Sequence, residues 1–296
     1  MRIVSLLPST TEILFDIGAG DEVVGVTFEC DYPPEALTRK MVSTSALPEG
    51  LTPTEIDAFV VKAMHAGEDL YHLDAGALSG LDAGLVVTQD LCAVCAVDVS
   101  VVDDALNHLG CTAEVLTIDP HTLDEVLDSI ATLGKATSRE VPAAALVSSL
   151  RARLDEVVRR TAGRPAPRTL VLEWTDPPFA PGHWVPEMVS LAGGSSVLGT
   201  KGEKSFRVAW DDVRSSSPEV VVCAPCGFGL DQSTALAHEL VGSAVLPADV
   251  PVWAVDANGS FARPGPRLVD GVEALAGILH PDIVKPPREE MARRIR

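Results

Sequence analysis

The chain has 296 residues, of which 46% are hydrophobic, so it is long enough to bury two substantial cores. Its formal net charge of -19 repels phosphate backbones and anionic membranes, which argues against nucleic acid as a partner. No segment reaches about eighteen consecutive apolar residues, so no membrane span is predicted. The opening MRIVSLLPSTTE lacks a charged leader followed by a long apolar segment. As written, the chain is expected in the cytoplasm, and outside it if its start has been trimmed.

Strands and helices are predicted to alternate through the first half of the chain. Short apolar runs predict strands at residues 2–7, 22–27, 85–88 and 114–118, and helical patterns cover 98–109 and 122–133. The spacing of a capping box marks three helix starts, at Ser9 with Glu12, Thr52 with Glu55, and Thr122 with Glu125. This alternation predicts a parallel sheet wrapped by helices.

A longer amphipathic helix is predicted over Ser138 to Gly163. Apolar residues recur there at spacings of three and four, and arginines fall mostly between them. Its roughly 24 residues would span about 36 Å, which is long for a crossover between neighbouring strands. We therefore expect a strut that joins two lobes; one long crossover inside a single sheet is the alternative.

The alternation resumes after this helix. Strands are predicted at 169–173, 219–222 and 252–255, and helices at 184–192 and 264–279, while Pro281 to Arg296 is expected to be a frayed basic tail. The predicted fold class is α/β, with two parallel-sheet lobes joined by one long α-helix. The expected boundaries are 1–137 for the first lobe, 138–163 for the linker helix, 164–282 for the second lobe and 283–296 for the tail.

The candidate ligand-binding residues lie after the predicted strands, where open α/β sheets bind their ligands. In the first half these are Cys30, Asp31, Tyr32, Gln89, Cys92 and Cys95. In the second half they are Trp174, His183, Trp184, Cys226, Phe228, Phe261 and Arg263. Aromatic residues make up only 4% of the chain, so their grouping at strand ends favours stacking on a flat ligand.

Several of these residues also have a structural interpretation. Trp184 opens an apolar helical face and is equally well explained as core. His183 is either an axial ligand to a metal within a cofactor or a hydrogen-bonding loop residue. Arg263 either pairs with a carboxylate or amide rim of a ligand or fixes a helix entry. The other histidines lack the spacing of a metal site and are expected at the surface or at helix caps: His65, His72, His108, His121, His238 and His280.

The cysteines suggest a second function class. Cys92 with Cys95, and Cys223 with Cys226, form two CxxC pairs, a spacing that suits zinc or an iron-sulfur cluster if the pairs converge. The alternative to a ligand-binding protein is therefore an intracellular metal-binding or redox protein that uses Cys30, Cys92, Cys95 and Cys226. The sequence contains no G-x-S-x-G, Walker or H-E-x-x-H motif, so we predict no catalytic residues, no catalytic cofactor and no enzyme activity.

Five segments together carry a family resemblance. They are RIVSLLPSTTEILFDIGAGDEVVGVTFECDYP, QDLCAVCAV, GHWVPEMVSLAGG, CAPCGF and FARPGPRLVDGVEAL. In combination, over residues 1–280, they resemble the vitamin B12-binding members of the periplasmic-binding-protein superfamily. The resemblance implies a ligand cleft between two lobes, a cobalamin, other corrinoid, related tetrapyrrole or metal chelate as ligand, and an ABC transporter permease as partner.

The same resemblance implies that four residues lie near the ligand. It places Tyr32, Trp184, Phe261 and Arg263 in segments that approach the ligand in such proteins, and Phe228 is a looser match. Because one stiff helix joins the lobes, we expect little closure when the ligand binds.

Overall fold

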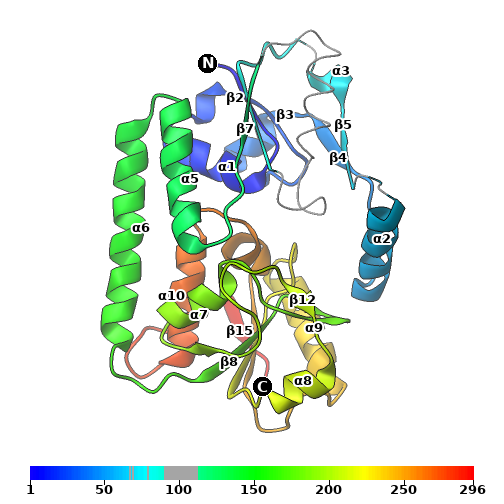
Figure 1. The fold of residues 1–296 in the computed structure, drawn as a ribbon, viewed down its shortest axis with the longest axis vertical. Coiled ribbons are helices and arrows are strands. Elements are labelled where there is room, and N and C mark those ends of the chain that lie inside the picture. The colour runs from blue at the N-terminus through cyan, green and yellow to red at the C-terminus, as the bar shows by residue number, and fades with distance from the viewer. Residues whose placement is uncertain (67, 69, 79, 90–112) are drawn as a thin grey trace. The chain divides into compact units, whose positions relative to one another are not determined.

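The computed structural model describes residues 1–66, 68, 70–78, 80–89 and 113–296. These residues form two compact units: unit 1 comprises Met1–Pro120 and Leu127–Val147, and unit 2 comprises His121–Val126 and Ser148–Arg296. Each unit has its own mainly parallel sheet with helices packed around it (Figure 1). The predicted α/β fold with two parallel-sheet lobes is therefore confirmed. The helix expected at 98–109 lies outside the described residues.

Unit 1 is built on five parallel strands in the order β3-β2-β1-β6-β7. Its elements are β1 (Ile3–Ser5), α1 (Pro8–Asp16), η1 (Gly20–Glu22), β2 (Val23–Val26), η2 (Pro34–Thr38), β3 (Lys40–Met41), β4 (Ser43–Ser45), α2 (Pro53–Ala66), β5 (Tyr71–Leu73), α3 (Ala75–Leu78), β6 (Leu85–Thr88) and β7 (Glu114–Thr117). Strand β1 is central, because Ile3 pairs with Val23 on one side and with Leu85 on the other. Strands β4 and β5 form a separate antiparallel pair. All four strands predicted in this half are thus present.

Two of the three predicted capping boxes are confirmed. At the start of α2, Thr52 N donates to Glu55 Oε2 at 2.8 Å, and Glu55 N donates to Thr52 Oγ1 at 3.4 Å. Thr122 and Glu125 make the same reciprocal pair before α5 (Leu123–Ala136). The box predicted at Ser9 is wrong. Helix α1 begins at Pro8, which places Ser9 inside the first turn, and no side chain caps the helix.

The long helix is confirmed as α6 (Glu140–Thr161), a single helix of 22 residues. The helix crosses from unit 1 to unit 2 without a break, between Val147 and Ser148. Helix α5 also crosses the boundary, between Val126 and Leu127. Beyond the end of α6, Gly163 has a φ of +74°, the left-handed conformation that commonly terminates helices. The two units are therefore linked by two continuous helices.

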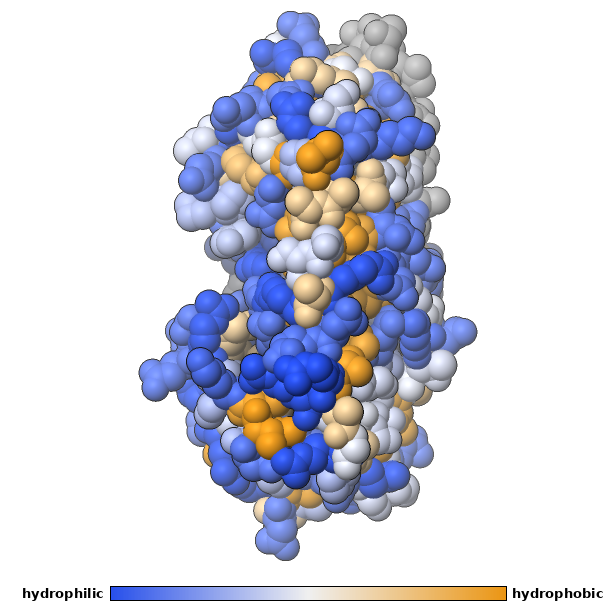
Figure 2. Space-filling view, turned by 90° about the vertical axis from the view of Figure 1, so that its left-hand side faces the viewer, coloured by the Kyte–Doolittle hydropathy of each residue, from blue (hydrophilic) through white to orange (hydrophobic). Residues whose placement is uncertain are grey.

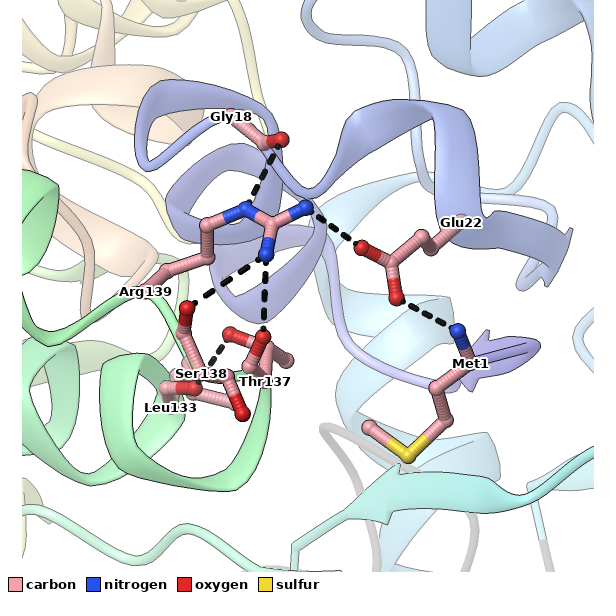
Figure 3. Close-up of polar contacts among 7 residues, drawn as sticks. All are labelled: Met1, Gly18, Glu22, Leu133, Thr137, Ser138 and Arg139. Atoms are coloured by element: carbon pink, nitrogen blue, oxygen red, sulfur yellow. Dashed lines mark hydrogen bonds and ion pairs between the residues drawn. The ribbon is translucent and has the colours of Figure 1, made fainter.

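Arg139 fastens the turn between α5 and α6 to unit 1 (Figure 3). Its guanidinium donates to the carbonyl oxygens of Gly18 at 3.4 Å and Thr137 at 3.3 Å. It also forms an ion pair with Glu22 at 2.7 Å, and Glu22 in turn pairs with the N-terminal ammonium of Met1 at 2.8 Å. One side chain thus joins the turn after α1, η1 and the α5–α6 turn.

Unit 2 is built on a five-stranded sheet in the order β11-β8-β13-β14-β15. Its further elements are β8 (Arg168–Leu172), β9 (Trp174–Thr175), β10 (Pro178–Ala180), α7 (Val185–Leu191), β11 (Ser195–Ser196), β12 (Phe206–Arg207), α8 (Trp210–Ser215), β13 (Val220–Cys223), α9 (Leu230–Gly242), β14 (Val252–Val255), η3 (Asn258–Ala262), α10 (Leu268–Leu279) and β15 (Ala292–Arg294). Helices α7 and α10 pack together, while α9 packs on β13 and β14 (Figure 1). A small antiparallel sheet, β12-β10-β9, completes the unit.

The end of the chain differs from the prediction. Residues 281–296 were expected to be a frayed tail, but β15 pairs antiparallel with β14 along Trp253–Arg294, Ala254–Arg293 and Val255–Ala292. The backbone satisfies its hydrogen bonds by adding an edge strand, and the arginines remain on the outside where edge strands tolerate charge.

Each unit has its own core. In unit 1 the buried cluster includes Val4, Leu6 and Val86, and in unit 2 it includes Leu170 and Val221.

The side of the molecule that carries α5 and α6 is mostly polar, with separate apolar patches (Figure 2). In the part of the chain that the structure describes, no helix has the length and apolar character needed to cross a membrane.

Candidate functional site

The carboxyl ends of the unit 1 strands carry the first group of predicted residues. Cys30, Asp31 and Tyr32 follow β2, and Gln89 follows β6, as expected. Cys30 and Gln89 are buried, whereas the Tyr32 side chain is 41% exposed. Cys92 and Cys95 lie outside the described residues. Tyr32 is therefore the aromatic residue of this group that a ligand can reach from solvent.

A buried hydroxyl network lies beneath these residues and was missed by sequence reasoning. Ser5 Oγ contacts Thr10 Oγ1 at 2.7 Å and accepts a hydrogen bond from Thr11 Oγ1 at 2.8 Å. Thr11 Oγ1 also lies 3.1 Å from Cys30 Sγ. The signal in the sequence was the run Ser9-Thr10-Thr11, whose small polar side chains follow a fully buried strand. The network fixes the β2 loop to the start of α1.

In unit 2, an aromatic pair joins the ends of two neighbouring strands. Trp174, just after β8, stacks on Phe228, which follows β13, with ring centroids 5.5 Å apart and planes inclined by 17°. Strands β8 and β13 pair directly, with Leu172 opposite Cys223, so their carboxyl ends bring the two rings together. Both rings are partly exposed. This pair forms an apolar surface of the kind on which flat ligands stack.

Trp184 and Phe261 form a second contact at this edge. Trp184 is 5% exposed, and its indole Nε1 donates to the carbonyl oxygen of Phe261 at 2.7 Å. Phe261 belongs to η3, a five-residue π-helical turn that starts three residues after the end of β14, and is itself 3% exposed. Arg263 follows this turn and is 9% exposed. The indole thus holds the backbone of η3, and whether any of these three residues contacts a ligand stays a prediction.

His183 lies in a tightly constrained loop before α7. Its φ of +48° is left-handed, its backbone N donates to Glu203 O at 2.6 Å, and its carbonyl oxygen accepts from Gly202 N at 2.9 Å. A Cβ on the preceding Gly182 would lie 2.1 Å from the backbone N of Ser205, so only glycine fits there. Burial, aided by the charges of His121 and Lys204, lowers the pKa of His183. The imidazole is therefore favoured in its neutral form.

Glu173 sits at the centre of this edge and was also missed. It directly follows β8, and its Oε1 accepts a hydrogen bond from Gly182 N at 2.9 Å, while its carbonyl oxygen accepts from Cys226 N at 3.0 Å. Burial raises the pKa of the Glu173 carboxyl to about 7, against the hydrogen bonds from Gly182 and Ser205. The signal was a glutamate at the end of the apolar run Thr169 to Leu172.

His121 was also not selected as a site residue, since it was expected at the surface or at a helix cap. It is partly buried, and its ring centroid lies 5.8 Å from that of His183. Its backbone N donates to Glu125 Oε2 at 2.6 Å, which fixes it at the start of α5. The two histidines are far apart in the sequence, so no local pattern reveals this contact.

Among the residues that the structure describes, the cysteines are not grouped as a metal site requires. Cys30 is buried in unit 1, whereas Cys226 is exposed in unit 2. Cys223 is fully buried at the end of β13, and burial raises the pKa of its thiol to about 12, which disfavours the thiolate that metals and disulfide exchange require. Within the described ranges, no group of three or more His, Cys, Asp or Glu side chains is arranged to hold a metal ion.

The chain is similar to known proteins over nearly its whole length. A model of the family described as "Periplasmic binding protein" matches residues 85–243, more than half of the chain. A vitamin B12-binding protein of Vibrio cholerae is 26% identical over 287 residues, covering 94% of this chain and 88% of that protein. An ABC transporter substrate-binding lipoprotein of Bacillus subtilis, YvrC, itself uncharacterized, is 25% identical over 304 residues, covering 96% of this chain and 81% of that protein.

Among solved structures, a periplasmic heme-binding protein from Pseudomonas aeruginosa has a TM-score of 0.72 with this chain. The match covers 99% of this chain and 97% of that one at 18% sequence identity. At this identity the likeness concerns the fold, and the loops at the strand ends decide what each protein binds.

Proposed function

Because the chain belongs to the periplasmic binding protein family, we propose that it is a substrate-binding protein for a tetrapyrrole-like ligand, with a corrinoid such as cobalamin as the first candidate. Binding involves no covalent chemistry, and the ligand is passed on to an ABC transporter permease. Heme is the second candidate, since the vitamin B12-binding relative and the heme-binding structural neighbour are both named for tetrapyrrole-type ligands.

The observation that carries this proposal is the stacked pair of Trp174 and Phe228. Two partly exposed aromatic rings, 5.5 Å apart and close to parallel, lie at the carboxyl ends of adjacent parallel strands. This is the edge at which α/β sheets bind ligands, and a broad flat macrocycle gains most from such a surface. Tyr32 is the corresponding solvent-exposed aromatic residue at the strand ends of unit 1.

Hydrogen bonds constrain the loops around this pair, as a binding site for a rigid ligand requires. The Trp184 indole holds η3 through the Phe261 carbonyl, and Glu173 holds the His183 loop through Gly182 N. Such hydrogen bonds keep the loops in one conformation, so less conformational entropy is lost when a ligand binds.

The names of the relatives support a transporter partner and an extracytoplasmic location. The Bacillus subtilis relative is named as an ABC transporter substrate-binding lipoprotein, and the matching family is periplasmic. These names support an extracytoplasmic site of action and favour that alternative over the cytoplasmic location expected from the sequence as written.

Calorimetric titration of the full chain with aquocobalamin, cobinamide and hemin tests the proposal. We expect saturable one-to-one binding of at least one of the three, weakened about tenfold or more by Trp174→Ala and by Phe228→Ala, because each stacked aromatic contributes on the order of 1 to 3 kcal/mol. Trp184→Phe keeps an aromatic ring but removes the hydrogen bond to Phe261, so it should weaken binding less.

Phe15→Ala is the matched control, because Phe15 is a partly buried aromatic residue near the C-terminal end of α1, away from the strand ends that carry Tyr32. It should leave the dissociation constant unchanged. If a folded wild-type chain gives no heat with any of the three ligands, or if the Trp174 and Phe228 variants bind as the wild type does, the proposal fails.

A further inference from the structure

His121 and His183 form a pair of imidazoles that the proposed function does not require. Both belong to unit 2, and their ring centroids are 5.8 Å apart with planes inclined by 44°. His183 Nε2 is buried and has no hydrogen-bond partner among the described residues. A buried nitrogen without a partner is energetically unfavourable, and a bound ion is one of the groups that can satisfy it.

The surrounding structure holds both rings in place. His183 keeps a left-handed φ of +48° because hydrogen bonds to Glu203 and Gly202 fix its backbone on both sides. His121 is fixed by the bond from its backbone N to Glu125 Oε2. A strained backbone that persists under such constraint is typical of a functional residue, and it sets the direction of the ring before any ligand arrives.

The separation of the rings suits one metal ion between them. With a metal–nitrogen bond of about 2.1 Å and a ring nitrogen about 1.1 Å from its ring centre, two imidazoles on one ion have centres roughly 4.5 to 6.4 Å apart for bond angles from about 90° to 180°. The observed 5.8 Å lies in that interval. Imidazole is a good ligand for Zn²⁺, Co²⁺, Ni²⁺ and Cu²⁺, whereas Mg²⁺ and Ca²⁺ prefer oxygen.

We propose that His121 and His183 form a two-histidine site for a late first-row divalent cation. The remaining coordination positions are taken by water or by groups of an exogenous chelator, which makes the site an open one. The carboxylate of Glu125, which accepts a hydrogen bond from His121 N at 2.6 Å, offsets part of the added positive charge. Glu187 is already paired with Lys201 at 2.5 Å. None of the residues of this site belongs to the stacked pair of Trp174 and Phe228.

Optical titration of the reduced full chain with Co²⁺ tests the site. We expect one equivalent to bind with a d–d spectrum and without a thiolate-to-cobalt charge-transfer band, which excludes the cysteines as ligands. His121→Ala and His183→Asn should each weaken Co²⁺ binding at least tenfold. Asparagine is chosen at position 183 because it tolerates a left-handed backbone, so the loop keeps its conformation while losing the imidazole.

His238→Ala is the matched control, since His238 is an exposed histidine on α9 of the same unit. It should leave Co²⁺ affinity unchanged, and circular dichroism should show every variant folded. Binding that is equally strong in the His121 and His183 variants, binding that carries a thiolate band, or no binding by the wild type would each overturn the proposal. None of these outcomes bears on the calorimetry with corrinoids and hemin, so the two proposals fail separately.

Discussion

Glu173 illustrates how a single buried carboxyl makes stability depend on pH. Its pKa is raised from 4.5 to about 7 by burial, so folding favours the protonated form. The stabilising contribution is therefore fully present below pH 4.5 and is lost as the pH rises through 7. Glu173→Gln keeps an oxygen for the hydrogen bond from Gly182 N but cannot ionise. We expect the variant to gain stability relative to wild type between pH 5 and pH 8, by at most about 3 kcal/mol.

Urea unfolding gives the free energy of unfolding of wild type and variant at pH 5 and at pH 8. The gain is the change, between the two pH values, in the difference between variant and wild type. Glu239→Gln, on the exposed face of α9, serves as the control for the loss of one surface charge. An equal gain in the control, or a gain that shrinks as the pH rises, would contradict the assignment to Glu173.

At the residue scale, the sequence predicted types of position better than contacts. It correctly put Trp174 and Phe228 after strands, because a break in a run of apolar residues marks the end of a buried strand. It gave no sign of the His121–His183 contact, since tertiary packing alone joins segments so far apart. Ligand contact by Trp184 stays a prediction. Its buried indole and its hydrogen bond to Phe261 fit a structural role.

At the scale of elements, helix α6 is held on α10 by Arg153. Its guanidinium forms ion pairs with Asp270 and with Glu273, the latter at 2.7 Å. The hydrogen bond that Arg153 donates to the Glu273 carboxylate is the main cause that raises the pKa of Arg153 further. We expect Arg153→Ala to lower the free energy of unfolding by about 1 kcal/mol, because the network is only partly shielded from solvent.

Arg151→Ala is the matched control for this element. Arg151 lies on the same helix and pairs with Asp124 at 3.0 Å, but both side chains of that pair are about half exposed, so its loss should cost close to nothing. Urea unfolding of the two variants side by side compares them. Equal costs would mean that Arg153 does not fasten α6 to α10.

Helices and strands were predictable wherever the local sequence pattern determines their bounds. Strand β6 and strand β14 have the predicted bounds, and α6 ends within two residues of them, because each has a clear apolar period and a marked end. Strand β15 was not predictable, since Ala292–Arg294 is basic and becomes a strand only by pairing with β14. The cap predicted at Ser9 is wrong because the helix starts at Pro8, so its N-cap position is Leu7, two residues before Ser9.

At the scale of the whole molecule, the two units should respond separately to damage in their cores. Leu6 in unit 1 and Leu170 in unit 2 are both at most 1% exposed, and each belongs to the buried cluster of its own unit. Leu→Ala at such a position costs about 2 to 5 kcal/mol. We expect Leu170→Ala to speed hydrogen exchange mainly in peptides from 164–279, and Leu6→Ala mainly in peptides from 1–89. If either variant speeds exchange equally in both units, the chain unfolds as one cooperative body.

Ligand binding should change the dimensions of the molecule little. Both α5 and α6 pass from one unit to the other as unbroken helices, at Val126–Leu127 and at Val147–Ser148. A large change between the units requires bending two hydrogen-bonded helices, whereas receptors with loop hinges need only rotate a few backbone dihedrals. Solution scattering with and without saturating aquocobalamin should give radii of gyration equal within error. Ser149→Pro, which breaks α6 just after the boundary, should restore a measurable compaction, and a large compaction in the wild type would refute this view of the helices.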